Sequence, residues 1–434
     1  MFQTIVNAFK IKEVRKKILI TIGLLFVYMV GCRIPVPGVN MFEGLENYTF
    51  LQIMSGVSGG ALQYGTFFAM GIGPYINASI IIQLLTVGIP ALERLSKQGE
   101  EGRRRINTYT RILTLVLAIA QAIGILVTFE NMNNGSIALD QLFGNDGFAK
   151  FLSYAFLVIV YTAGAALTMW LGERITDYGV SNGISLLIFA GILATAGTTI
   201  FAMIKALFVP ETAQNAAWQL VGFLVVAILI FTAIVAVNSA ERKIPVQYAR
   251  QVKGRKMYGG QSTHIPIKVN ASGVMPLIFA FAILSFPDLI INLLGGASED
   301  WWWSRNVGTG TWVYMVLLCV LILFFSYFYN QIQFNPDDIS KSIQGNGGFI
   351  PGTRPGKPTA DYLKRVSNRI TLFGAIFLAL VALIPSLLFK AIGGEGLTNV
   401  FSATGLLIIV SVALEFEQAL QSQIMMKNYK GFLK

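Results

Sequence analysis

Charged side chains are scarce in this chain, and the residue types that most metal and catalytic sites need are almost absent. Only 13% of its 434 residues are charged, against 54% hydrophobic residues, and its mean hydropathy is +0.62. A water-soluble fold could not bury that much apolar surface, so the solvent around it is expected to be lipid. The single histidine, His264, excludes a metal cluster or catalytic triad built on histidine. The two cysteines, Cys32 and Cys319, lie in apolar stretches that suit inert buried thiols.

Long apolar runs are what the chain does have. A helix needs about 20 apolar residues to cross roughly 30 Å of hydrocarbon, and runs of that kind predict ten transmembrane helices. The expected fold class is therefore an all-α polytopic membrane protein. The predicted spans lie at about residues 18–32, 74–90, 106–128, 151–171, 183–204, 216–240, 271–294, 311–333, 370–389 and 398–420.

The basic residues predict the orientation of these spans. Nearly all of the 33 Lys and Arg residues fall in the two terminal segments and in the connections after spans 2, 4, 6 and 8. Because Lys and Arg gather on the cytoplasmic side of a membrane, both termini are expected to be cytoplasmic. Ten spans with both ends on one side divide into two inverted halves of five, here residues 1–206 and 207–434. A Gly-Pro-Ile-Ala-Ile pattern recurs at identical spacing from Gly71 and from Gly273, as a trace of duplication or by chance.

Chemistry inside the spans is limited. Only four charged residues lie within them, all toward a span's end: Arg111, Asp288, Glu415 and Glu417. Ion pumps normally need an ionisable group at the centre of a span, so an ion-coupled transporter is disfavoured. The chain also lacks a catalytic carboxylate pair and a phosphate-binding loop, so we expect no enzyme activity, no cofactor and no metal site.

The second span is broken by Gly71, Gly73 and Pro74. Irregular backbone at membrane depth is tolerated only where protein or a water-filled cavity covers it, so this span is expected to be a half-crossing that faces a cavity. Asn77 and Gln83 follow, and each amide serves either as a bond between helices or in gating. A ring of isoleucines could close such a cavity by excluding water.

Two connections are long, basic and predicted to be cytoplasmic, at residues 241–270 and 334–369. The first is typical of a hairpin of two extended runs that meet near Lys253 and Gly254. In the second, prolines and glycines around residues 346–358 exclude helix and leave Arg354 and Lys357 on a projecting tip. Attraction to anionic lipid could explain the charge, but has less to say about two turn-shaped projections.

The chain resembles the SecY/Sec61-alpha family, the channel of the Sec protein translocon, along essentially its whole length. The resemblance implies ten helices in two inverted halves hinged between spans 5 and 6, with a half-helix plug at about residues 54–66. The motifs that carry it are RIPVPG (33–38), GGAL (59–62), GPYINASIIIQLL (73–85), EGRRRINTYTR (101–111), WLGERIT (170–176), NGISLLIFAGI (182–192), QSTHIPIKVN (261–270) and GFIPGTRPG (348–356).

Three groups of site residues follow from the resemblance. A pore ring is implied at six isoleucines: Ile72, Ile76, Ile184, Ile188, Ile278 and Ile408. A lateral gate between spans 2–3 and 7–8 is implied at Gln83, Thr110 and Asn270, with Asn77 facing Phe286. Partner binding is implied at Arg255, Lys256 and Arg354.

The implied function is a passive protein-conducting channel in the bacterial inner membrane. Unfolded secretory polypeptides with their signal peptides would cross it, and apolar segments would leave sideways into the membrane lipids. The implied partners are the small membrane subunits SecE and SecG, the motor ATPase SecA and the ribosome. Two alternatives stay open: a secondary transporter of a small solute, since inverted repeats and a broken helix also mark that class, and a structural lipid scaffold.

Overall fold

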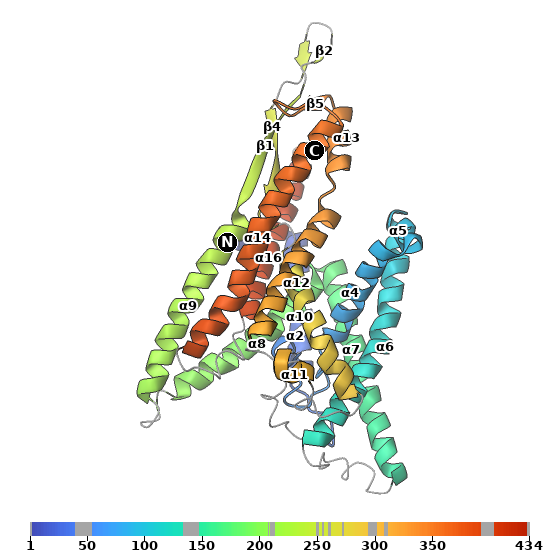
Figure 1. Cartoon of the computed structure of the whole chain (residues 1–434), viewed down its shortest axis with the longest axis vertical. Helices are drawn as coiled ribbons and strands as arrows, with labels where there is room; N and C mark the ends of the chain where they lie inside the picture. Colours follow the sequence, from blue (N-terminus) through green and yellow to red (C-terminus); the bar gives the residue numbers. More distant parts are fainter. Residues whose placement is uncertain are drawn as a thin grey trace.

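The structure of the chain is a computed structural model (Figure 1). It describes residues 2–39, 54–132, 147–206, 208, 213–248, 251–253, 256–258, 262–270, 273–293, 302–307, 311–391 and 403–431.

Each of the ten predicted spans is covered by a helix. In chain order these helices are α2 (Lys12–Gly31), α4 (Gly73–Gly88), α6 (Glu100–Met132), α7 (Gly147–Tyr178), α8 (Gly183–Ala206), α9 (Ala213–Ser239), α10 (Met275–Leu293), α12 (Trp312–Gln333), α14 (Lys357–Ala391) and α16 (Ala403–Gly431). Shorter helices in the described part of the chain include α1 (Phe2–Lys10), α5 (Pro90–Ser96), α11 (Trp302–Val307) and α13 (Pro336–Gly345), and residues 54–57 form a further helical turn.

Five helical stretches among the described residues are long and apolar enough to cross a membrane, or six if α4 and α5 count as one bent span. They include α6, α7, α12 and α14, together with residues Leu220–Ser239 of α9. At about 1.5 Å per residue, the 33 residues of α6 and the 35 of α14 are longer than a bilayer's hydrocarbon core. Either helix is therefore long enough to cross that core with residues to spare.

The break predicted before α4 has a clear backbone cause. Gly71 adopts a positive φ of 52°, which disfavours continued helix for other residue types, and Pro74 sits in the first turn, where no amide donor is needed. At the other end, Pro90 cannot continue the hydrogen-bond ladder of α4. The chain bends there by 105° into α5.

Both long basic connections contribute to one small sheet. Strands β1 (Glu241–Tyr248) and β4 (Ser262–Lys268) pair antiparallel, and β5 (Gly348–Phe349) adds to the other edge of β1. Strands β2 (Gln251–Lys253) and β3 (Lys256–Tyr258) continue the hairpin outward. The predicted hairpin is confirmed, and Figure 1 shows it rising above the helices.

The second connection is shorter than expected. Helix α13 occupies its first part, capped by the Asn335 side chain, which accepts a hydrogen bond from the Asp337 amide. Helix α14 already begins at Lys357, so only residues 346–356 lie between the two helices. The predicted loop at residues 334–369 is therefore largely helical, because the helix-breaking prolines and glycines occupy only its centre.

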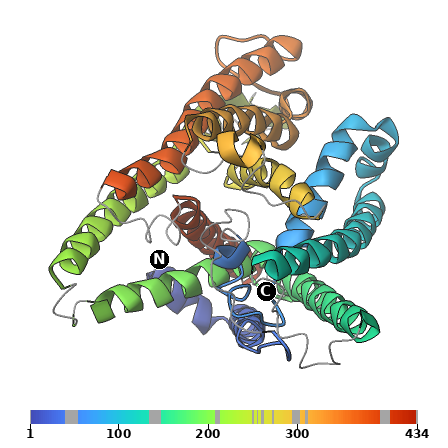
Figure 2. The same ribbon diagram turned by 60° about the horizontal axis from the view of Figure 1, so that its bottom comes forward.

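The helices surround α16. Figure 2 shows the blue and green helices of the first half on one side, the yellow and orange helices α10, α12 and α14 on the other, and dark red α16 between them. Helix α16 contacts α2 and α8 as well as α9 and α14. Helix α1 packs against α16, and the Lys268 side chain of β4 donates to Gln418 of α16 at 2.9 Å. Helix α1 and strand β4 therefore both contact α16.

Candidate functional site

The six isoleucines expected to form a ring lie in one cluster of buried side chains. They come from four separate parts of the fold: Ile76 from α4 with Ile72 immediately before it, Ile184 and Ile188 from α8, Ile278 from α10, and Ile408 from α16. Ile72 is only 1% exposed, whereas Ile76, Ile184 and Ile278 are partly buried.

Helical spacing explains why these residues meet. Ile72 and Ile76 are four residues apart, as are Ile184 and Ile188, so each pair lies on one face of its helix. Gly172 of α7 allows a close approach there, since a Cβ built on it would lie 3.3–3.5 Å from Leu187, Ile184 and Ile72. The cluster is therefore a packed apolar layer between helices far apart in sequence.

The segment at residues 54–66 packs against this layer. Ala61 is fully buried and belongs to the same cluster as the isoleucines, and Val57 packs on it. Only residues 54–57 are helical and residues 58–65 form turns, where Gly59, Gly60 and Gly65 all adopt positive φ, and Thr66 then pairs with Pro35 in an isolated bridge. The described part of the expected half-helix plug is therefore one helical turn followed by turns.

A hydrogen bond joins the two sides of the predicted gate. Tyr329 of α12 donates its hydroxyl proton to Gln83 Oε1 of α4 at 2.6 Å. The Gln83 amide also donates to the Ser79 hydroxyl on its own helix at 3.3 Å. Helix α6 contacts α4 and α10, and α10 contacts α12. We call this contact of α4 and α6 with α10 and α12 the gate seam.

The other predicted gate residues make their bonds elsewhere. The Asn270 amide donates to Asn238 Oδ1 of α9 at 2.8 Å, and the Asn238 amide donates to the Ser411 hydroxyl of α16 at 2.9 Å. The buried Thr110 hydroxyl donates to a backbone carbonyl of its own helix, that of Ile106. Asn77 is half-buried on α4. The Phe286 backbone belongs to α10, and its side chain lies outside the described part of the chain.

A small polar cavity adjoins Asn270. Its lining includes Ser326 and Asn330 of α12 and Thr371 of α14, and the space open to water is about 10 Å³. Asn270 Oδ1 and the Ser326 hydroxyl are buried without a protein partner in the described structure. A cavity of this size, with two free polar atoms at its wall, suits a single water molecule.

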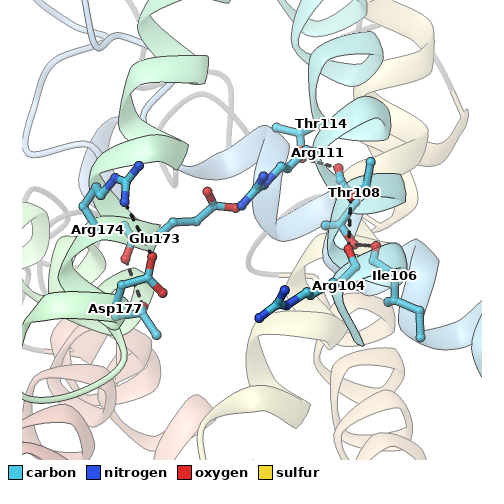
Figure 3. Close-up of polar contacts among 11 residues, drawn as sticks. Arg104, Ile106, Thr108, Arg111, Thr114, Glu173, Arg174 and Asp177 are labelled. Atoms are coloured by element: carbon cyan, nitrogen blue, oxygen red, sulfur yellow. Dashed lines mark hydrogen bonds and ion pairs between the residues drawn. The ribbon is translucent and has the colours of Figure 1, made fainter. Parts of the chain in front are cut away.

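Sequence reasoning missed an ion pair that links α6 to α7. Figure 3 shows Arg111 of α6 reaching toward α7, where its Nε donates to Glu173 Oε1 at 2.7 Å. At the opposite end of the same helix pair, Lys150 and Tyr154 of α7 donate to Glu130 of α6 and hold the pKa of its carboxyl below the usual range. Polar contacts thus tie α6 to α7 at both ends. The signal in the sequence that could have indicated this ion pair is Arg111 itself, a charged residue within the apolar run at 106–128.

Two of the three predicted partner-binding residues, Lys256 and Arg354, lie within the described residues. Arg354 is exposed in the short stretch after β5, and its carbonyl accepts a hydrogen bond from the Thr359 hydroxyl at 2.8 Å. Lys256 begins β3, whereas Arg255 lies outside the described residues. Both cysteines are free, and within the described residues no group of three or more His, Cys, Asp or Glu side chains could hold a metal ion.

A family model and full-length relatives both match this chain, and both carry the name SecY. The family model named SecY matches residues 66–417. The chain is 41% identical over 457 residues to the protein translocase subunit SecY of Streptomyces griseus, and 39% identical over 465 residues to that of Mycobacterium tuberculosis, each covering 100% of both chains.

Solved structures share the fold. A structure described as a protein conducting channel matches with a TM-score of 0.68 at 20% identity, covering 94% of this chain and 92% of the other. Sec61 in a canine ribosome-channel complex from the endoplasmic reticulum matches with a TM-score of 0.64, also at 20% identity and with the same coverage. The helix arrangement and the full-length sequence identity agree, and the chain belongs to the SecY family.

Proposed function

We propose that this protein is the channel subunit of a protein translocon. Unfolded secretory polypeptides pass through the ring of six isoleucines, and sufficiently apolar segments leave through the gate seam into lipid. The observation that carries this proposal is that isoleucines from four separate elements share one apolar cluster. Such a layer seals by excluding water and binds no passenger strongly, which suits a channel for varied sequences.

The two halves, residues 1–206 and 207–434, are proposed to move about the connection between α8 and α9. All ten long helices span the membrane in this proposal, with both termini in the cytoplasm of a bacterial cell. Contact between α1 and α16 supports a shared location for the ends of the chain. Segment 54–66 is the plug that occupies the outer side of the ring at rest.

The energy for transport comes from partners in this proposal, and the channel itself performs no catalysis. The exposed Arg354 and the basic hairpin with Arg255 and Lys256 are the proposed contacts for the SecA motor or the ribosome. SecE and SecG are the proposed membrane subunits. Relatives of this fold have been solved with ribosomes, including Sec61 and a yeast Ssh1 complex.

Photocrosslinking tests the proposal directly. A photoreactive residue in place of Ile76 should crosslink to a secretory chain stalled during export. The control is Ile159 of α7, an isoleucine that is 67% exposed and remote from the cluster. Polypeptide crosslinks from Ile159 alone, or from neither position, would contradict a channel and favour the transporter of a small solute.

A further inference from the structure

The backbone of segment 54–66 touches the backbone of α8. A Cβ built on Gly191 of α8 would lie 2.0 Å from the Val57 carbonyl oxygen and 3.2 Å from the Gly59 amide nitrogen. The contact is reciprocal, because a Cβ built on Gly59 would lie 3.4 Å from the Cα of Gly191. Gly59 also has a φ of +72°, which a side chain would disfavour. Gly191 therefore permits this approach because it has no Cβ, and Gly59 favours it because it adopts a positive φ.

A hydrogen bond reinforces this contact one turn further along the helix. The Thr195 hydroxyl lies 3.1 Å from the Gly56 carbonyl oxygen of the segment and 3.1 Å from the Gly191 carbonyl oxygen of its own helix. The single Thr195 hydroxyl proton is therefore shared between the segment and α8. We call Gly191 and Thr195 the α8 seat.

The α8 seat lies on the same helix face as the isoleucine cluster. Ile184, Ile188, Gly191 and Thr195 follow one another at spacings of four, three and four residues, which places them on one face. The segment that rests on the seat therefore lies on the face of α8 that carries Ile184 and Ile188.

The far end of the segment is attached to a different element. The Val36 amide donates to the Gly65 carbonyl at 3.1 Å, and the Phe67 amide donates to the Ile34 carbonyl at 3.0 Å. These bonds join the segment to the stretch that follows α2. Its beginning is fastened to α8 and its end to that stretch, so loss of the seat would leave one end attached.

We propose that Gly191 and Thr195 are the positioning residues that hold segment 54–66 against the isoleucine cluster and so keep the resting channel sealed. The sealing role in this inference rests on the proposed function, whereas the contact between the segment and α8 does not. When the seat is lost, the beginning of the segment swings away while its end stays joined to the stretch after α2.

The test uses the full-length protein with its membrane subunits in lipid nanodiscs, without any client. Hydrogen–deuterium exchange is measured for peptides that cover residues 54–66. Thr195→Val removes the hydroxyl at nearly constant volume, and its matched control is Thr198→Val, whose exposed hydroxyl donates to the Thr195 carbonyl of its own helix. A net hydrogen bond changes an opening equilibrium by about fivefold, so exchange should rise about fivefold in the first variant alone.

A second pair of variants tests the close approach. Gly191→Ala should accelerate exchange of the segment by about tenfold or more, because the Val57 carbonyl must move. Gly197→Ala on the same helix is the control, since a Cβ there meets nothing within 4 Å. If Gly191→Ala fails to assemble, Thr195→Val still decides the outcome.

Resting ion permeability of proteoliposomes is measured on the same four variants. Faster exchange together with higher permeability in Thr195→Val, and in neither control, supports the proposal. Unchanged hydrogen–deuterium exchange of residues 54–66 in Thr195→Val would overturn the proposal that the α8 seat holds the segment. Faster exchange with wild-type permeability overturns its sealing role. Because no client is present, these results do not depend on whether a polypeptide crosslinks to Ile76.

Discussion

The Tyr329 hydroxyl on α12 and the Gln83 side chain on α4 share a hydrogen bond of 2.6 Å across 246 positions of sequence. Interhelical hydrogen bonds in membranes are worth about 0.6–2 kcal/mol. Removing this one in Tyr329→Phe should therefore raise the open population of the gate seam by about threefold to thirtyfold. Spin labels at the exposed positions Val87 of α4 and Ile332 of α12 report the change as longer distances in pulsed electron resonance.

The matched control is Tyr327→Phe on the same helix. Tyr327 donates to the Asn368 carbonyl of α14 at 3.3 Å, a contact within the second half of the chain. Its loss should leave the distance between the labels unchanged. Equal shifts in both variants would show that the Tyr329 bond does not hold the seam.

A cysteine pair at Asn77 and Phe286 tests whether the seam is the lateral exit. If the two positions face each other as predicted, an oxidant should join them, and export should stop because α4 and α10 can no longer separate. Reductant should restore export. Single cysteines at each position serve as controls, and normal export with the disulfide formed would refute the gate assignment.

Substitution of a buried ring isoleucine should open a path for water. Ile188 is 5% exposed in the cluster, and burying such a side chain is worth about 1.5–3 kcal/mol. Ile188→Ser removes that apolar surface, so the resting ion permeability of proteoliposomes should rise by about tenfold or more. Leu193→Ser on the same helix, at a position that is 51% exposed, should leave permeability at the wild-type level.

Charge reversal at Arg354 tests the partner surface. Arg354→Glu should abolish export driven by the motor or by the ribosome, because an anionic partner would then be repelled, while the channel still inserts into the membrane. Lys364→Glu, at an exposed position of α14, is the control for general loss of positive charge. Wild-type export by the Arg354 variant would refute its role.

Local sequence signals predicted the helices well. Apolar runs of about 20 residues gave the location of all ten long helices, and Gly71 with Pro74 gave the start of α4. Spacings of four residues account for the shared face of Ile72 with Ile76 and of Ile184 with Ile188, whereas their place in a pore ring was implied by the family resemblance and stays a prediction. These features depend on neighbours along the chain, so the sequence contains them.

Contacts between distant helices could not be predicted in the same way. Nothing near Gln83 identifies Tyr329 as its partner, and nothing near Arg111 identifies Glu173. Gly191 is one of 43 glycines, and only the path of segment 54–66 shows that its missing side chain matters. Such pairings follow from how the helices pack, which a single sequence does not encode locally.

The sheet built from β1, β4 and β5 has a consequence for genetics. Gly348 of β5 lies so close to β1 that a Cβ there would be 2.8 Å from the Tyr248 ring, and Ile343 of α13 is 3.1 Å away. Two loops that are separate in sequence therefore share one packed unit with α13. Substitutions in residues 241–268 and 348–349 should show strong non-additivity, and suppressors of a defect in one loop should arise in the other.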